Sequence, residues 1–208
     1  MIKEGRKVLN FFIGIVIILI LAVLGIFYDF QILLFFESLR NVFLTELLAI
    51  LFFNSAIIIF YLFTIILLWK TNKKNYILPL LIGLGLSLFL GYLTKNFIAR
   101  PRPFLIYPEL IDLNIASFYS SLGHFSFPSS HAISVFFCLP ILNKALPKLK
   151  YFWISFAIVV ALSRVYFGVH YFTDVLAGAV LGYAIGFIFL KIAEKYSSNK
   201  KNIVKKKR

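Results

Sequence analysis

One stretch of the chain, Ser163 to Asp174, carries an arginine, a histidine and an aspartate between two apolar runs. Ionisable side chains at membrane depth are costly, about 2.5–3.5 kcal/mol each at a helix centre, so such residues usually have a function. His170 and Asp174 are four residues apart, which places both on one face if the segment is helical. A carboxylate there can accept the imidazole Nδ1–H and leave Nε2 free as base or nucleophile. Arg164 adds a planar fork of donors that suits phosphate.

Two further clusters contain residue types that suit the same chemistry. Lys95 and Arg102 are seven residues apart, and the segment Pro128–His131 opens a later apolar run with two hydroxyls and a histidine. Helix starts of this kind bind anions through their free backbone N–H groups. Cations, hydroxyls, two histidines and a carboxylate are what phosphoryl transfer needs when no metal takes part. Because no residue cluster has the spacing of metal ligands, the sequence predicts neither a metal nor a cofactor. A polar clamp between helices is the alternative interpretation.

The composition of the chain is that of a membrane protein. Its 208 residues are 61% hydrophobic and 14% charged, with a mean hydropathy of +0.92, which excludes the soluble globular classes. The length suits one membrane domain, residues 1–208. The net charge of +14 lies beside the apolar runs, where it indicates membrane topology and contact with anionic lipid. The bilayer is therefore a predicted partner, and nucleic acid is not.

The apolar runs predict an all-α protein that crosses the membrane six times. The predicted spans are Val8–Tyr28, Leu47–Trp69, Tyr76–Thr94, Ser130–Leu142, Tyr151–Tyr166 and Tyr171–Leu190. Asp29–Glu46 has apolar residues at helical spacing and predicts an amphipathic helix in the interface, which would admit lipid or serve only as a connector. Gly83, Gly85 and Gly91 in the third span predict close helix packing. The basic tail, residues 191–208, is predicted to be partly disordered.

The distribution of positive charge predicts that both termini are cytoplasmic. With that orientation, all but five of the 22 lysines and arginines lie on the cytoplasmic side. The five exceptions are Arg40, Lys95, Arg100, Arg102 and Arg164. Four of them lie beside the polar loop 104–127 or in the stretch Ser163–Asp174, so they need a reason other than topology. Arg100 could contact a substrate headgroup or be a solvated loop cation, and His124 falls in no motif and has no predicted role.

The three clusters resemble the motifs of the type 2 phosphatidic acid phosphatase superfamily, a family of integral membrane lipid phosphatases. Its pattern is Lys, six residues, Arg-Pro; then Pro-Ser-Gly-His; then Ser-Arg, five residues, His, three residues, Asp. This chain shows Lys95 to Pro103, Pro128 to His131 and Ser163 to Asp174 with the same spacing, and Ser130 stands where the family usually has glycine.

The resemblance implies a role for each matched residue. His170 would be the nucleophile that forms a phosphohistidine, Asp174 would orient it, and His131 would be the general acid. The phosphate ligands would be Lys95, Arg102, Ser129, Ser130 and Arg164. Ser163 also matches the motif, although residue types alone do not indicate what it contacts.

We therefore expect hydrolysis of a lipid phosphomonoester or diphosphate at the outer face of a bacterial-type cytoplasmic membrane. Candidate substrates, by resemblance, are phosphatidylglycerophosphate, undecaprenyl diphosphate, phosphatidate and lipid A 1-phosphate. One alternative is a phosphotransferase that uses a lipid acceptor instead of water. Another is a catalytically silent lipid transporter, against which the complete set of His170, His131 and Asp174 argues.

Overall fold

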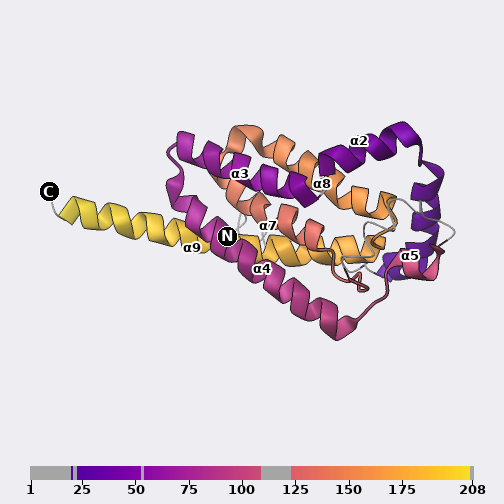
Figure 1. Ribbon diagram of the computed structural model, residues 1–208. Helices are drawn as coiled ribbons and strands as arrows, with labels where there is room; N and C mark the ends of the chain where they lie inside the picture. Colours follow the sequence, from indigo (N-terminus) through magenta and orange to yellow (C-terminus); the bar gives the residue numbers. More distant parts are fainter. Residues whose placement is uncertain (1–19, 21–22, 53, 109–122, 207–208) are drawn as a thin grey trace, which may run out of the picture.

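The computed structural model describes residue 20 and residues 23–52, 54–108 and 123–206, which are mostly helical (Figure 1). The helices are residues 23–38, α2 (Val42–Phe52), α3 (Asn54–Lys70), η1 (Lys74–Tyr76), α4 (Ile77–Ile98), α5 (Pro103–Ile106), α7 (Ser130–Ala145), η3 (Pro147–Leu149), α8 (Lys150–Tyr166) and α9 (Phe172–Lys206). Within these parts of the chain there is no strand, only an isolated bridge between Pro101 and Phe125. The predicted all-α class is confirmed for them.

Helix α7 forms the centre of the bundle, and α3, α4, α8 and α9 contact it. Most of its side chains are buried, among them Val135, Phe137 and Cys138. A helix of 16 residues is about 24 Å long, which is shorter than the roughly 30 Å hydrocarbon layer. Since its neighbours surround it, α7 does not need a uniformly apolar surface, and it tolerates Ser134 and Asn143.

Three helical segments among the described residues are long and apolar enough to cross a membrane. They are Lys74–Ile98, Pro147–Tyr166 and Phe172–Tyr196, which correspond to the third, fifth and sixth predicted spans. Most of the predicted first span lies outside the described residues, and the apolar part of α3 is shorter. Crossing the membrane six times stays a prediction. Helix α9 continues beyond the bundle to Lys206 (Figure 1), through most of the tail for which partial disorder was expected.

The prediction of a single amphipathic helix over Asp29–Glu46 is wrong. Residues 23–38 form one helix that includes the end of the predicted first span, and α2 begins only at Val42. Asn41 accounts for the break, because its side-chain Oδ1 accepts the backbone N–H of Leu44 at 2.9 Å and caps α2. Local capping therefore divides a segment whose apolar spacing is continuous.

Three glycines of α9 bring its backbone directly against that of α7. These residues, Gly178, Gly182 and Gly186, recur every four positions, and we call them the glycine stripe. A Cβ at Gly178 would lie 2.6 Å from the carbonyl oxygen of Ser129, and one at Gly182 would collide with the backbone of Ile133. Small residues at this spacing allow helices to approach closely. The stripe fixes the register of α7, which begins at the second cluster, against α9, whose first turn carries Asp174.

Of the three glycines predicted to pack closely in the third span, two do so. A Cβ at Gly83 would collide with Phe137, and a Cβ at Gly91 would lie 2.5 Å from Ile133, both in α7. At Gly85 a Cβ would meet no described atom within 4 Å, so the prediction is wrong there. Eight residues after Gly83 the helix has turned to within about 80° of the same direction, whereas two residues after it the helix has turned about 200° away.

Candidate active site

The turn after α4 brings the first cluster back towards α7. The helix ends at Ile98, because Ala99 has a left-handed conformation (φ 51°) and the prolines that follow prevent its continuation. The backbone N–H of Arg102 donates to the carbonyl of His124 at 3.2 Å. Lys95, in the last turn of α4, donates from Nζ to the carbonyl of Phe125 at 3.1 Å. Both cations are thus fastened to the segment that leads into α7.

Arg102 is buried beside His170. Its Nε donates to the carbonyl of Gly123 and its Nη1 to that of Val169, both at 2.9 Å. The same Nη1 lies 3.4 Å from Nε2 of His170. Because arginine can only donate, this arrangement assigns the lone pair of a neutral His170 to Nε2 and its proton to Nδ1.

His170 lies in the turn between α8 and α9. Its backbone N–H donates to the carbonyl of Arg164 at 3.3 Å, and Gly168, with φ 66°, allows the chain to turn. Its Nδ1 is 3.5 Å from Oδ2 of Asp174, in the first turn of α9, which is longer than a strong hydrogen bond. No described atom is a closer hydrogen-bond partner of Nδ1. His170 and Asp174 were predicted to share one face of a helix. In the structure His170 precedes α9, and Asp174 lies in its first turn.

Burial controls the protonation of His170, whose side chain is only 4% exposed. Burial lowers the pKa of His170 to about 4, although the carboxylate of Asp174, 3.5 Å from Nδ1, acts in the opposite direction. The positive charges of Arg102 and Lys95 add to the decrease. The ring is neutral at pH 7, which is the state that a nucleophile requires.

The start of α7 presents buried polar atoms that lack partners. Ser129 directly precedes the helix, but its hydroxyl does not cap it, and the buried Oγ has no hydrogen-bond partner among the described residues. The same holds for Nε2 of His131, which lies within electrostatic range of Arg164 and Arg102. Buried polar atoms are normally paired, so this end of α7 is suited to a bound anion. Ser130 is the first residue of α7 and half-buried, and its part in binding phosphate stays a prediction.

Arg164, in the last turn of α8, is fully buried. Its Nε and Nη2 donate to the hydroxyl of Ser163 at 3.1 and 3.0 Å, and its guanidinium lies 5.2 Å from the ring centroid of Phe167. The structure thus gives Ser163 a contact that residue types alone do not indicate. Its hydroxyl helps to hold Arg164.

The structure adds Asp29 and Thr173 to the residues that the sequence predicts. Arg100 donates to Oδ2 of Asp29 at 2.8 Å and to Oδ1 of Asp174 at 2.9 Å, and it lies 3.8 Å from the ring centroid of Tyr171. Burial opposes the charge of Arg100, but the two carboxylates outweigh it and raise its pKa. The interpretation of Arg100 as a solvated loop cation is therefore wrong. The sequence contains one sign of the role of Asp29. This aspartate directly follows the first predicted span, on the side of the membrane where topology does not explain the cations.

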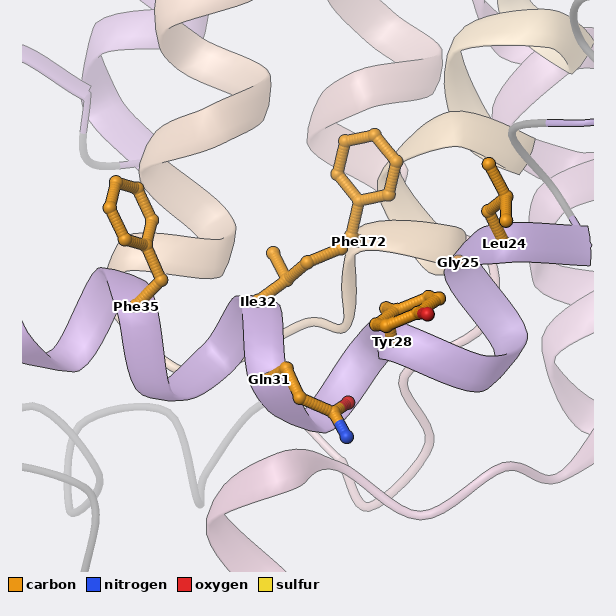
Figure 2. Close-up of a pocket in the computed structure, with 7 residues that line it drawn as sticks. All are labelled: Leu24, Gly25, Tyr28, Gln31, Ile32, Phe35 and Phe172. Atoms are coloured by element: carbon orange, nitrogen blue, oxygen red, sulfur yellow. The ribbon is translucent and has the colours of Figure 1, made fainter.

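An apolar groove of about 480 Å³ lies where helix 23–38 meets the start of α9 (Figure 2). Its lining residues are Leu24, Gly25, Tyr28, Gln31, Ile32, Phe35 and Phe172. Figure 2 shows the Phe172 ring beside helix 23–38, between Phe35 and Leu24 in this view. Phe172 directly precedes Thr173 and Asp174, so the groove adjoins the element that carries the site carboxylate. Its apolar lining suits a hydrocarbon chain.

The family model of the PAP2 superfamily matches residues 76–197, which include all three clusters. An undecaprenyl-diphosphatase from Sulfolobus acidocaldarius is 32% identical over 138 residues, which cover 62% of this chain and 60% of that protein. Phosphatidylglycerophosphatase B from Bacillus subtilis is 34% identical over 132 residues, which cover 57% and 58%. The match spans about three fifths of the length of these curated relatives.

A solved structure shares the fold. The crystal structure of a PAP2 type phosphatidylglycerolphosphate phosphatase from Bacillus subtilis matches with a TM-score of 0.62 and 23% identity, covering 89% of this chain and 94% of that chain. The family model extends over more than half of the sequence and includes the residues that meet at the site. As the motifs predict, the chain belongs to the PAP2 superfamily of type 2 phosphatidic acid phosphatases.

Proposed function

We propose that this protein hydrolyses a lipid phosphomonoester or diphosphate through a phosphohistidine intermediate. The observation that carries the proposal is the contact between Nε2 of His170 and the guanidinium of Arg102 at 3.4 Å. The unpaired Oγ of Ser129 and Nε2 of His131 lie at the start of the adjoining helix. A neutral nucleophile, a group that stabilises developing charge and a second histidine are the parts that metal-free phosphoryl transfer requires.

In the first step, the lone pair on Nε2 of His170 attacks phosphorus. The new P–N bond forms as the bond between phosphorus and the lipid oxygen breaks, and His131 gives its proton to that oxygen. The bound phosphate beside His131 favours the protonated ring that this transfer needs. Lys95, Arg102 and Arg164 would stabilise the charge on the equatorial oxygens.

In the second step, water attacks the phosphohistidine and the P–N bond breaks. His131, now neutral, takes a proton from the water, and inorganic phosphate leaves. Asp174 stabilises the positive charge that the imidazole carries while phosphate is attached to it. The lysine and arginines supply the positive charge that a metal provides in other phosphatases, so the proposal includes no metal and no cofactor.

The apolar groove and the relatives both support a lipid substrate. The relatives' names specify an undecaprenyl diphosphate and a phosphatidylglycerophosphate, both of which are lipids that carry a terminal phosphate group. Phosphatidate and lipid A 1-phosphate have the same chemistry and complete the candidate set. The groove beside Phe172 would hold part of the hydrocarbon.

The distribution of charge supports a site that faces outward in a bacterial-type cytoplasmic membrane. At the end of α7 and α9 remote from the site, Lys144 and Lys191 both pair with Glu194. The basic tail and the basic loop after α3 belong to the same side in the predicted topology. The site would then lie on the opposite, outer side.

Phosphate release by the purified protein from the four candidate lipids tests this function. We expect release from at least one lipid, no effect of a chelator, inhibition by vanadate, and an acid-labile phosphoenzyme after rapid quenching. His170→Ala should reduce release by at least about 10³-fold. His124→Ala is the matched control, because the exposed His124 side chain lies in no motif, and it should retain activity.

Other outcomes would contradict the proposal. No phosphate release from any lipid, with phosphate moving from the donor lipid to an added acceptor lipid, would indicate a phosphotransferase. Absence of release and of phosphoenzyme with every lipid, with or without acceptor, would favour a transporter. Activity that is lost in chelator and restored by magnesium would show that a metal takes part.

A further inference from the structure

The two carboxylate oxygens of Asp174 have different partners. Oδ2 accepts the backbone N–H of Tyr171 at 2.9 Å and lies 3.5 Å from Nδ1 of His170. Oδ1 pairs with Nη1 of Arg100 at 2.9 Å. The carboxylate is fully buried and cannot rotate without breaking one of these contacts. Arg100 and the backbone N–H of Tyr171 together therefore determine which oxygen faces the proposed nucleophile.

A second buried carboxylate holds Arg100 in turn. Nη2 of Arg100 donates to Oδ2 of Asp29 at 2.8 Å, and the Asp29 side chain is only 5% exposed. Asp29 also accepts the backbone N–H and the hydroxyl of Thr173, which fastens helix 23–38 to the first turn of α9. Nη1 of Arg100 donates to the Thr173 hydroxyl at 2.6 Å. We call Asp29, Arg100, Thr173 and Asp174 the carboxylate bridge.

The carboxylate bridge places a net negative charge beside His170. It has two carboxylates and one guanidinium, so Asp174 shares the positive charge of Arg100 with Asp29. Without Asp29, Arg100 would pair with Asp174 alone and neutralise it more completely. A carboxylate that keeps its negative charge stabilises an adjacent imidazolium better.

We propose that Asp29 and Arg100 are positioning residues for His170. Arg100 aligns the Asp174 carboxylate, and Asp29 limits how far Arg100 neutralises it. This inference rests on the proposed phosphohistidine mechanism. It gives helix 23–38 a part in the reaction, although that helix precedes residues 76–197, which carry the family match.

A contact between Arg100 and the lipid headgroup is the competing role, since the Arg100 side chain is 29% exposed. The two roles change different kinetic constants. Loss of a headgroup contact raises KM and leaves kcat nearly unchanged, whereas loss of a positioning contact lowers kcat and leaves KM nearly unchanged.

Three variants and a control separate these roles. Arg100→Gln leaves two buried carboxylates without their cation and should lower kcat by about 100-fold, the cost of misplacing a reacting group by about 1 Å. Asp29→Asn should lower kcat by about 10-fold. The double variant removes both charges together, so it should be about 10-fold more active than Arg100→Gln alone. Glu194→Gln, which breaks a 3.1 Å ion pair with Lys144 at the other end of the bundle, should match the wild type.

Nitrogen-15 NMR of labelled histidine gives a readout that does not depend on turnover. The chain has only three histidines, so substitution of each one assigns the spectrum. We expect His170 to carry its proton on Nδ1 in the wild type and Glu194→Gln, and to show mixed tautomers in Arg100→Gln. A change of tautomer in Arg100→Gln without any phosphohistidine in the wild type would refute the proposed function, while still showing that Arg100 sets the tautomer of His170.

Several results would overturn the positioning role. One is an Arg100→Gln variant with an unchanged His170 spectrum and an unchanged kcat. Another is an Arg100→Gln variant with a higher KM at constant kcat. A third is a double variant that is no more active than Arg100→Gln. If Arg100→Gln is aggregated on gel filtration, the same kinetic constants and the His170 spectrum are measured for Asp29→Asn and Arg100→Lys instead. Arg100→Lys keeps the charge but cannot bridge two carboxylates, and its kcat should fall between those of the wild type and Asp29→Asn.

Discussion

Replacement of Ser129 by alanine should make the protein more stable and less active. The hydroxyl is fully buried, has no hydrogen-bond partner among the described residues and does not cap α7. A buried polar group without a partner costs roughly 1–3 kcal/mol. Ser129→Ala should therefore raise the free energy of unfolding by about 1 kcal/mol, because the small space left by the oxygen offsets part of the gain.

The loss of activity follows from the same hydroxyl. In the proposed complex it donates to a phosphate oxygen, and a hydrogen bond to a charged group is worth about 1.5–3 kcal/mol. At about 1.4 kcal/mol per tenfold change, kcat/KM should fall by about 10- to 100-fold in Ser129→Ala.

Thermal unfolding in one detergent and phosphate release measure the two effects side by side. Ser134→Ala is the control, because the Ser134 hydroxyl donates to the carbonyl of Ser130 at 2.9 Å in the same helix. It should not raise the unfolding temperature and should leave kcat/KM unchanged. If Ser129→Ala unfolds at a lower temperature than the wild type, its hydroxyl has a structural partner. If Ser129→Ala keeps full kcat/KM, the hydroxyl does not bind phosphate, and either result refutes the reasoning.

Three further predictions concern the chemistry and the orientation of the site. With a pKa of about 4, His170 is neutral above pH 5, so the acid side of the profile of kcat/KM, corrected for substrate ionisation, should be centred near pH 4; an acid-side fall centred near 6.5 would contradict this. The carboxylate of Asp174 raises this pKa, and the positive charges of Arg102 and Lys95 lower it. His131→Ala should retain phosphohistidine formation with a nitrophenyl phosphate, whose leaving group needs little protonation, and should lose it with a lipid alcohol; rapid-quench trapping distinguishes the two. A cysteine at position 114 should react with an impermeant reagent on whole cells and one at position 199 should not, and the reverse pattern would place the site on the cytoplasmic side.

The motif residues could be predicted because charged groups are conspicuous in so apolar a chain. Arg102, His170 and Asp174 meet in the structure, and the positive-inside count had already marked Arg102 as a cation that topology does not explain. The carboxylate bridge could not be predicted in the same way. Asp29 and Arg100 are 71 residues apart, and no periodicity records a contact over that separation.

The fold could be predicted where length and hydropathy decide the structure. Helices α4, α8 and α9 correspond to predicted spans for this reason. The prediction failed where a single side chain determines where a helix begins. Asn41 is the example, because it caps α2 and so divides a segment that the apolar spacing predicts as one helix. The central place of α7 could not be read from its own sequence either, because its burial depends on the helices around it.

The glycine stripe limits how enzymes built on this scaffold can diverge. The three glycines are four residues apart, which is about 6 Å along α9, so the backbone of α7 can move along α9 only in steps of about that length. Such a step would carry His131 out of proton-transfer range of a phosphate on His170, and smaller steps are blocked by backbone collision. New substrate preferences can therefore arise in the helices outside this pair and in side chains that face away from the contact, such as Phe172 in the groove. A chimera that exchanges residues 23–38 for another sequence, while keeping Asp29, would change the lining of the groove and leave the catalytic register untouched.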